Sequence, residues 1–166
     1  AFKSKKNKKE EGDTGVSIGI RGPVTLQSAF SVDPIEICDM QITKSVNSEN
    51  NTGRRSSDTM GMKYRVSKAI YMFFGSMNPQ LAERTGFSGA DAEVIKQTLP
   101  RLLLNDESSA RPAGSMEILT VFWWEHNCKI GQYSSAKVHR TLSVNQDGTY
   151  SLENLDNLEP EIIDGF

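Results

Sequence analysis

Residues 44–65, KSVNSENNTGRRSSDTMGMKYR, decide how this chain is organised. The middle of this stretch has almost no apolar side chain, so it cannot form part of a core. Its basic residues outnumber its acidic ones, and patterns typical of β-strands flank it on both sides. The stretch therefore predicts a basic arm that projects from a sheet, which is suited to gripping phosphates. The basic residues are Lys44, Arg54, Arg55, Lys63 and Arg65.

Apolar and polar residues alternate on both sides of this arm. Such alternation over residues 16–21, 24–32 and 35–46 predicts strands, with Pro23 at an edge or bulge. After the arm, residues 64–74 predict one long strand. Its second half is apolar on both faces, which indicates a central strand covered on both sides.

Two helices are predicted next. Asn78 followed by Pro79 is typical of a helix start, and Gly86 of its end. Ser88 with Asp91 three residues later resembles a capping box, and it opens a helix at about residues 89–104. Pro100 lies inside that range and should kink the helix or confine the break to one turn.

The C-terminal part returns to strand patterns. Residues 115–126 form the most hydrophobic strand candidate, and residues 136–144 alternate again. Asp147-Gly148 predicts a hairpin turn that returns through Tyr150 and Leu152. An acidic tail with no basic residue follows.

The order of these elements predicts an α+β fold, with helices on one face of a mostly antiparallel sheet. The part from residue 64 to residue 126 fits the second half of a ferredoxin-like, or RRM-like, unit. The first half would need a strand and a helix before residue 1, and the chain begins with Ala1 rather than Met. We therefore expect an N-terminally truncated fragment whose sheet has an unpaired edge.

Composition and charge limit the classes of function that are open to this chain. The chain has 166 residues and a net charge of −2, but residues 1–75 carry +4 and residues 76–166 carry −6. This asymmetry leaves nucleic-acid binding open, because binding depends on the field at one face. No stretch is long and apolar enough for a membrane span or a signal peptide. Cys38 and Cys128 form no paired framework, which favours a reducing, cytoplasmic location.

Six short stretches stand in an order that resembles a known family: GIRGPV at 19–24, SVDPI at 31–35, QITK at 41–44, TMGMK at 59–63, TGFS at 85–88 and NDESSAR at 105–111. Together they are similar to the CRISPR-associated backbone subunit of type I Cascade-like complexes, in the RAMP superfamily. The likeness is closest to the type I-C branch and runs from about residue 15 to residue 139.

This resemblance implies an RRM-like palm, a helical finger region and a protruding β-hairpin thumb at about residues 36–62. It also implies a non-catalytic role in antiviral defence, in which copies polymerise along CRISPR RNA with other Cascade subunits and present the guide for pairing with target DNA. The domains are then a mobile Lys-rich segment (1–14), the partial palm with its thumb and helix (15–144), and a hairpin return with the acidic tail (145–166). No cofactor or metal is implied.

The predicted RNA contacts follow from the arm and from this resemblance: Arg21, Lys44, Arg54, Arg55, Lys63, Arg65 and Arg111. Three of them have a plain alternative. Arg54 and Arg55 could form a solvated turn, and Arg111 could pair with Asp106 or Glu107 instead of a phosphate. The lysines of residues 3–9 could be a solvated loop or an RNA contact.

Apolar residues near the arm raise similar alternatives. Met60 and Met62 could wedge between bases or pack on the palm. Trp123 and Trp124 could stack on bases or be buried, and as neighbours on a strand they face opposite sides.

Other functions compete with RNA binding. His139 with Lys137 and Tyr133 could form an acid–base set for RNA cleavage, as in related RAMP-type endoribonucleases that process CRISPR RNA. Asp33 and Asp39 suggest the loop aspartate of the RNA-cutting backbone subunits of type III systems, although a turn explains Asp33 sufficiently. His126, Cys128 and His139 are metal-ligand types, but their spacing matches no zinc pattern. A third hypothesis is an interaction module whose acidic tail docks a basic partner.

Overall fold

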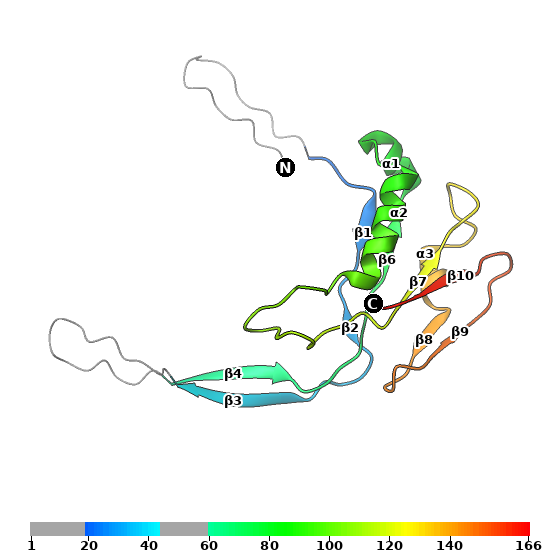
Figure 1. Ribbon diagram of the computed structural model, residues 1–166. Helices are drawn as coiled ribbons and strands as arrows, with labels where there is room; N and C mark the ends of the chain where they lie inside the picture. The colour runs from blue at the N-terminus through cyan, green and yellow to red at the C-terminus, as the bar shows by residue number, and fades with distance from the viewer. Residues whose placement is uncertain (1–18, 44–59) are drawn as a thin grey trace, which may run out of the picture. The chain divides into compact units, whose positions relative to one another are not determined.

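The computed structural model describes residues 19–43 and 60–166 and confirms the α+β class, with helices and small antiparallel ladders (Figure 1). The described strands pair two by two: β1 with β6, β2 with β5, β3 with β4, β7 with β10 and β8 with β9. The strands are β1 (Val24–Leu26), β2 (Phe30–Ser31), β3 (Ile37–Thr43), β4 (Met60–Val66), β5 (Tyr71–Met72), β6 (Gly75–Met77), β7 (Thr120–Trp124), β8 (Leu142–Val144), β9 (Tyr150–Leu152) and β10 (Pro160–Asp164). The helices are α1 (Pro79–Thr85), α2 (Gly89–Thr98), the 3-10 turn η1 (Leu99–Arg101) and α3 (Ser135–His139).

These elements belong to two compact units. One unit holds the described residues up to Gln27 together with residues 74–142 and 152–166. The other holds the described residues between Ser28 and Phe73 together with residues 143–151.

The start of α1 is set by its capping residues, as predicted. The side chain of Asn78 accepts hydrogen bonds from the backbone N–H groups of Gln80 and Leu81, at 2.9 and 3.3 Å. Pro79 occupies the first turn, where a missing N–H costs nothing. Gly86 ends the helix with φ of +74°, a left-handed conformation that suits glycine.

The capping box that opens α2 is also confirmed. The Ser88 hydroxyl accepts from the backbone N–H of Asp91, and the Asp91 carboxylate accepts from the backbone N–H of Ser88 at 2.8 Å. The α-helix is shorter than predicted and ends at Thr98, because Pro100 lies in a turn of 3-10 helix that continues to Arg101.

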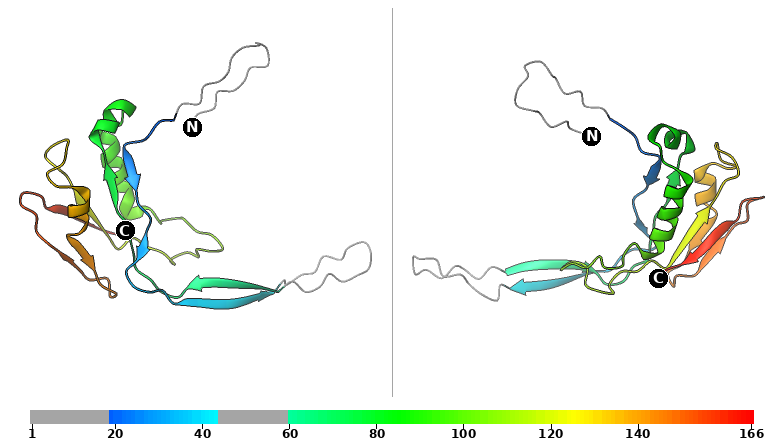
Figure 2. Two further views of the ribbon diagram at one scale, coloured as in Figure 1. Left: turned by 180° about the vertical axis from the view of Figure 1, so that it is seen from behind. Right: turned by 45° about the horizontal axis from the view of Figure 1, so that its top comes forward.

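Two ladders belong to the same unit as these helices. β1 pairs with β6, from Val24 opposite Met77 to Leu26 opposite Gly75. β7 pairs with β10, and the views of Figure 2 agree in placing the two strands side by side. The strand predicted over residues 115–126 is shorter in the structure, where β7 covers Thr120–Trp124. Its partner β10 lies in the stretch that was predicted as an acidic tail.

The other unit contains the ladder that was predicted to flank the basic arm. β3 pairs with β4 over seven residue pairs, from Ile37 opposite Val66 to Thr43 opposite Met60. β2 and β5 form a shorter ladder of two residue pairs. The hairpin of β8 and β9 is turned at Gly148, whose φ is +85°, as predicted from Asp147-Gly148.

Two strand predictions were wrong. The long strand predicted over residues 64–74 is instead the end of β4 and the short strand β5, separated by a bend at residues 67–68. Tyr71 is exposed there, so the strand is not covered on both sides. Residues 135–139 are helical, because the Ser134 side chain accepts from the backbone N–H of Lys137 and so caps α3.

Few side chains are buried in the described part of the chain. Pro23, Val138 and Leu158 are the buried apolar residues there, and Thr141 is the buried polar one. The Thr141 hydroxyl donates to the carbonyl of Val138 at 2.7 Å, which satisfies it. Among the residues that the structure describes, no helix has the length and apolar character that crossing a membrane requires.

Candidate nucleic-acid interface

Lys63 and Arg65 lie on one face of the β3–β4 ladder. Residues directly opposite each other on paired strands share a face, and successive residues alternate between faces. Lys63 lies opposite Met40, and Arg65 lies opposite Cys38. We name this side, with Ile42 opposite Gly61, the basic face of the ladder. It brings two of the predicted RNA contacts together.

The other side of the ladder, which we name the methionine face, carries Met60, Met62 and Tyr64 of β4. Tyr64 is 67% exposed, and Met60 and Met62 are exposed as well. Packing of the two methionines on the palm and insertion between bases both stay predictions. The amide of Gln41 donates to the Met60 sulfur at 3.1 Å across the ladder. Because methionines and basic residues alternate along β4, one flat surface cannot contact both sets.

Arg111 pairs with Asp106, which was one of its two predicted alternatives. Its guanidinium donates to the Asp106 carboxylate at 3.1 Å, and both side chains are about half exposed. The turn is closed by backbone hydrogen bonds between Ser108 and Arg111 in both directions. An ion pair so open to water contributes little stability, on the order of 0–1 kcal/mol. A phosphate contact by Arg111 stays a prediction.

The other predicted contacts are placed as follows. Arg21 is exposed and lies in the irregular segment before β1, in the unit that also holds Arg111. Lys63 and Arg65 belong to the other unit. Lys44, Arg54 and Arg55, like the lysines of residues 3–9, lie outside the described residues.

His139 is engaged in contacts within its own unit. Its imidazole stacks on Phe74, with ring centroids 4.3 Å apart and planes at 12°. It also forms a hydrogen bond with the Gly75 backbone. Burial lowers the pKa of His139, and the bond to Gly75 opposes this in part. The arrangement favours a neutral imidazole that joins α3 to β6.

The strand on which Lys137 and His139 were predicted to share a face is replaced by a helix, because both residues lie on α3. Residues two apart on a helix do not face the same side. The Lys137 ammonium instead lies 4.2 Å from the centroid of the Tyr133 ring, and the Tyr133 hydroxyl donates to the Asp156 carbonyl. These contacts do not converge on His139.

His126 is a hydrogen-bond acceptor in a closed loop. Its Nδ1 accepts from the backbone N–H of Gln132 at 3.0 Å, and the Gln132 side chain accepts from Asn127 and donates to the Asn157 carbonyl. Cys128 is exposed in the same loop. Residues 19–43 and 60–166 contain no group of three or more His, Cys, Asp or Glu that could hold a metal ion.

Trp123 and Trp124 are both half-buried on β7, where consecutive residues face opposite sides. Trp124 stacks with Phe122 at 6.1 Å between centroids, and the Lys96 ammonium lies 6.0 Å from the Trp123 ring. Asp33 lies in a bend after β2, as the turn explanation requires.

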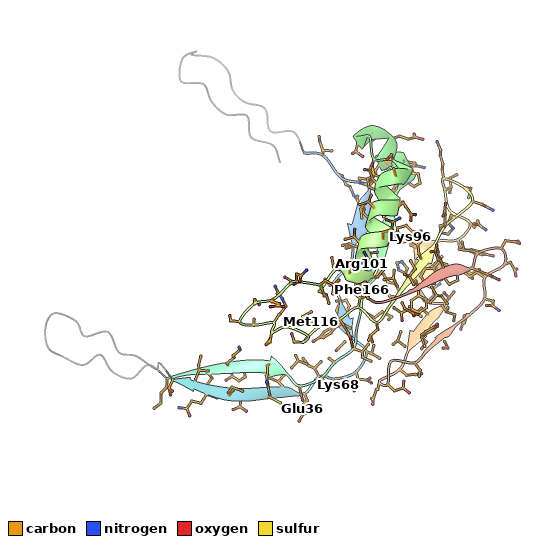
Figure 3. All side chains as sticks on the ribbon, viewed as in Figure 1. Glu36, Lys68, Lys96, Arg101, Met116 and Phe166 are labelled. Atoms are coloured by element: carbon orange, nitrogen blue, oxygen red, sulfur yellow. The ribbon has the colours of Figure 1, made fainter. Side chains whose placement is uncertain are left out.

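Sequence reasoning missed a charged and aromatic cluster at the end of α2. The Lys96 ammonium pairs with Glu161 of β10 at 2.5 Å and with Glu93 at 3.7 Å. The hydrogen bond with Glu161 raises the pKa of Lys96. One turn later, the Arg101 guanidinium lies over the ring of Phe166 (Figure 3). The acidic residues of the C-terminal stretch were visible in the sequence, but their pairing with β7 and α2 was not.

The structure thus presents an α+β protein with an exposed two-stranded ladder that carries a basic face. The family model for the CRISPR-associated protein Cas7 matches residues 5–162. The chain therefore belongs to the Cas7 family of CRISPR-associated proteins, within the RAMP proteins. No curated protein matches the chain significantly.

Proposed function

We propose that this chain is a non-catalytic backbone subunit that binds CRISPR RNA in a type I-C-like antiviral complex. Membership of the Cas7 family implies a role as an RNA-binding backbone subunit of a type I or type III complex. The observation that carries the proposal is the β3–β4 ladder, whose basic face holds Lys63 and Arg65. The same two strands lead into residues 44–59, which contain Lys44, Arg54 and Arg55.

The chemistry of the ladder suits a protein that must hold RNA without reading its sequence. Lysine and arginine contact phosphates, and phosphate contacts fix position without discriminating between bases. Within β3 and β4, the side chains that share the basic face with Lys63 and Arg65 are Cys38, Met40 and Ile42, none of them acidic. A phosphate that approaches this face therefore meets cations and apolar surface.

Assembly of several copies along one RNA is part of the same proposal. The ladder would act as the thumb that closes over RNA bound by the next copy, and other Cascade subunits would complete the complex. The guide would then pair with target DNA, in the cytoplasm. The TMGMK stretch, which supports the likeness to the type I-C branch, includes the first four residues of β4.

A non-catalytic role agrees with the surroundings of His139. A general base must reach the proton that it removes, with a pKa near neutrality. The His139 ring is stacked on Phe74, and burial lowers its pKa. The Lys137 and Tyr133 side chains contact each other rather than His139. These contacts support the proposal of a non-catalytic role over the endoribonuclease alternative.

The binding test compares two charge-matched double variants of the full chain. Replacing Lys63 and Arg65 by Ala should weaken binding of single-stranded RNA and flatten its dependence on salt. The slope of log K against log salt falls by about 0.7 for each phosphate that the protein no longer neutralises. Replacing Lys137 and Arg140 by Ala removes the same charge from α3 and its C-cap. Equal slopes for the two double variants would contradict the proposal.

The catalytic alternative has its own test. The full chain is incubated with CRISPR repeat RNA and a metal chelator, and we expect intact RNA. Cleavage that disappears in a His139→Ala variant would replace the binding-only proposal with a nuclease.

A further inference from the structure

Phe166 is held in place yet exposed to solvent. Its backbone N–H donates to the Pro100 carbonyl at 3.3 Å, and the Arg101 guanidinium carbon lies 4.7 Å from its ring centroid. The Phe166 residue is nevertheless 76% exposed. Figure 3 shows Arg101 and Phe166 together at the end of α2. The ring is thus oriented by its neighbours without being covered by them.

Phe166 and Arg101 line an open hollow of the surface at the end of α2 and β10. Its lining is part apolar, from Pro100, Ile163 and Phe166, and part polar. The remaining lining residues are Glu93, Lys96, Gln97, Arg101, Glu161, Asp164 and Gly165.

The charged side chains of this hollow are three carboxylates (Glu93, Glu161 and Asp164) and two cations (Lys96 and Arg101), a net charge of −1. Lys96 is paired with Glu161 and Glu93. Arg101 and Asp164 are the other charged groups of the lining. The Arg101 guanidinium lies over the Phe166 ring, and a guanidinium carries its N–H donors around its edge. The hollow therefore offers donors, a carboxylate acceptor and an open aromatic ring within one unit of the protein.

We propose that Phe166 and Arg101 form a platform that binds a nucleobase of single-stranded RNA. This inference rests on the proposed RNA-binding function and adds a base contact to the phosphate contacts of the ladder. A base stacks on the face of the Phe166 ring that Arg101 leaves open, while Arg101 donates to the adjoining phosphate and the Asp164 carboxylate accepts from an N–H at the edge of the base. A planar group with donors and acceptors fits this mixed lining better than an apolar side chain of a protein partner does.

The test uses the full chain and two RNA strands of equal length, one of mixed sequence and one abasic. Phe166→Leu keeps an apolar side chain but removes the aromatic face. We expect this variant to bind the mixed-sequence strand about fivefold or more weakly, because stacking of one base contributes that much. Its affinity for the abasic strand and its salt slope should stay those of the parent, since the stacking interaction that it removes is uncharged.

The Lys63→Ala, Arg65→Ala double variant separates this inference from the proposed function. It should weaken binding of both strands and flatten the salt slope. If it does so while Phe166→Leu binds both strands like the parent, the platform is wrong and the function stands. An equal decrease in affinity for both strands in Phe166→Leu would mean a structural role and would also overturn the platform. A parent chain that binds neither strand overturns both.

A second measurement needs no variant. RNA that contains 4-thiouridine is cross-linked to the parent chain by light, and the adducts are located by mass spectrometry. An adduct on Phe166 or Arg101 supports the platform. Adducts confined to other segments, with none near β10, contradict it.

Discussion

The imidazole of His139 lies nearly parallel to the ring of Phe74, 4.3 Å away between centroids. Phe74 immediately precedes β6, and His139 is the last residue of α3, so this contact joins two elements that are distant in the sequence. The hydrogen bond with the Gly75 backbone strengthens the same junction. His139, the candidate general base of the sequence analysis, therefore links α3 to the start of β6.

Stability should depend on the protonation of His139. Burial lowers the pKa of His139 in the folded state. Between that lowered value and the ordinary value of about 6.5, the unfolded chain binds the proton more readily than the folded chain does. Acidification through this pH window therefore favours unfolding. Above the window, the neutral His139 ring contributes its full stabilisation to the fold. We expect a lower melting temperature at pH 5.5 than at pH 7.5.

His139→Phe is the matching variant, because it keeps a ring against Phe74 but cannot be protonated. We expect the fall in melting temperature between the two pH values to be smaller in this variant. An unchanged fall would show that other groups cause the pH dependence.

Gly165 should tolerate no side chain. A Cβ atom at this position would overlap the carbonyl oxygen of Ile118, which is backbone and cannot swing aside. Gly165 also donates its N–H to the Leu119 carbonyl at 2.9 Å, next to the β7–β10 ladder. Gly165→Ala should lower the free energy of unfolding in urea by about 1–3 kcal/mol. Gly89→Ala is the control, because no atom lies within 4 Å of its added Cβ.

The capping box of α2 predicts a defined loss of stability. Ser88→Ala removes the side-chain acceptor for the Asp91 backbone N–H and should cost about 1 kcal/mol in urea unfolding. Hydrogen bonds from Ser88 lower the pKa of Asp91 in the folded state. The ionised Asp91 carboxylate therefore stabilises the fold fully at pH values above its ordinary pKa, and this stabilisation is lost as the pH falls through its lowered pKa in the folded state. The exposed Ser115→Ala should be nearly neutral. Equal losses in the two variants would argue against the cap.

The Asp106–Arg111 pair predicts a variant with increased rather than decreased RNA affinity. If Arg111 contacts phosphate, Asp106→Asn should raise RNA affinity, because it removes the carboxylate that now holds the guanidinium. Arg111→Gln should lower affinity and reduce the salt slope by about 0.7. Glu107→Gln removes a neighbouring charge and serves as the control. The same gain in Glu107→Gln and Asp106→Asn would indicate a general charge effect rather than a contact by Arg111.

Features that depend on a few neighbouring residues were predictable from the sequence. Asn78, Ser88 and Gly148 lie where the caps and the turn were expected. Each acts through its own backbone conformation or through hydrogen bonds within four residues. Alternation predicted strand character over residues 35–46 and from Tyr64 onward, and β3 and the end of β4 lie there, but the pairing of Met60 to Lys63 with β3 falls inside the predicted arm and was not foreseen.

Features that depend on distant partners were not predictable. The alternation of residues 136–144 fits a strand, but the Ser134 cap and the contact of His139 with Phe74 favour a helix over its first half. No sequence pattern within β10 predicts its pairing with β7, because the residues of β10 taken alone are typical of an acidic tail. Arg101 and Phe166 meet only through that pairing, so sequence reasoning could not have joined them.

The exposure of both faces of the β3–β4 ladder has a consequence for measurement. A two-stranded ladder without cover is only marginally stable, so its amide hydrogens should exchange with deuterium early in the free chain. Any partner that settles on either face would slow that exchange. The exchange rates of the β3 and β4 amides thus report whether a partner is bound to the ladder. Repeating the experiment with variants of one face at a time assigns the face to which the partner binds.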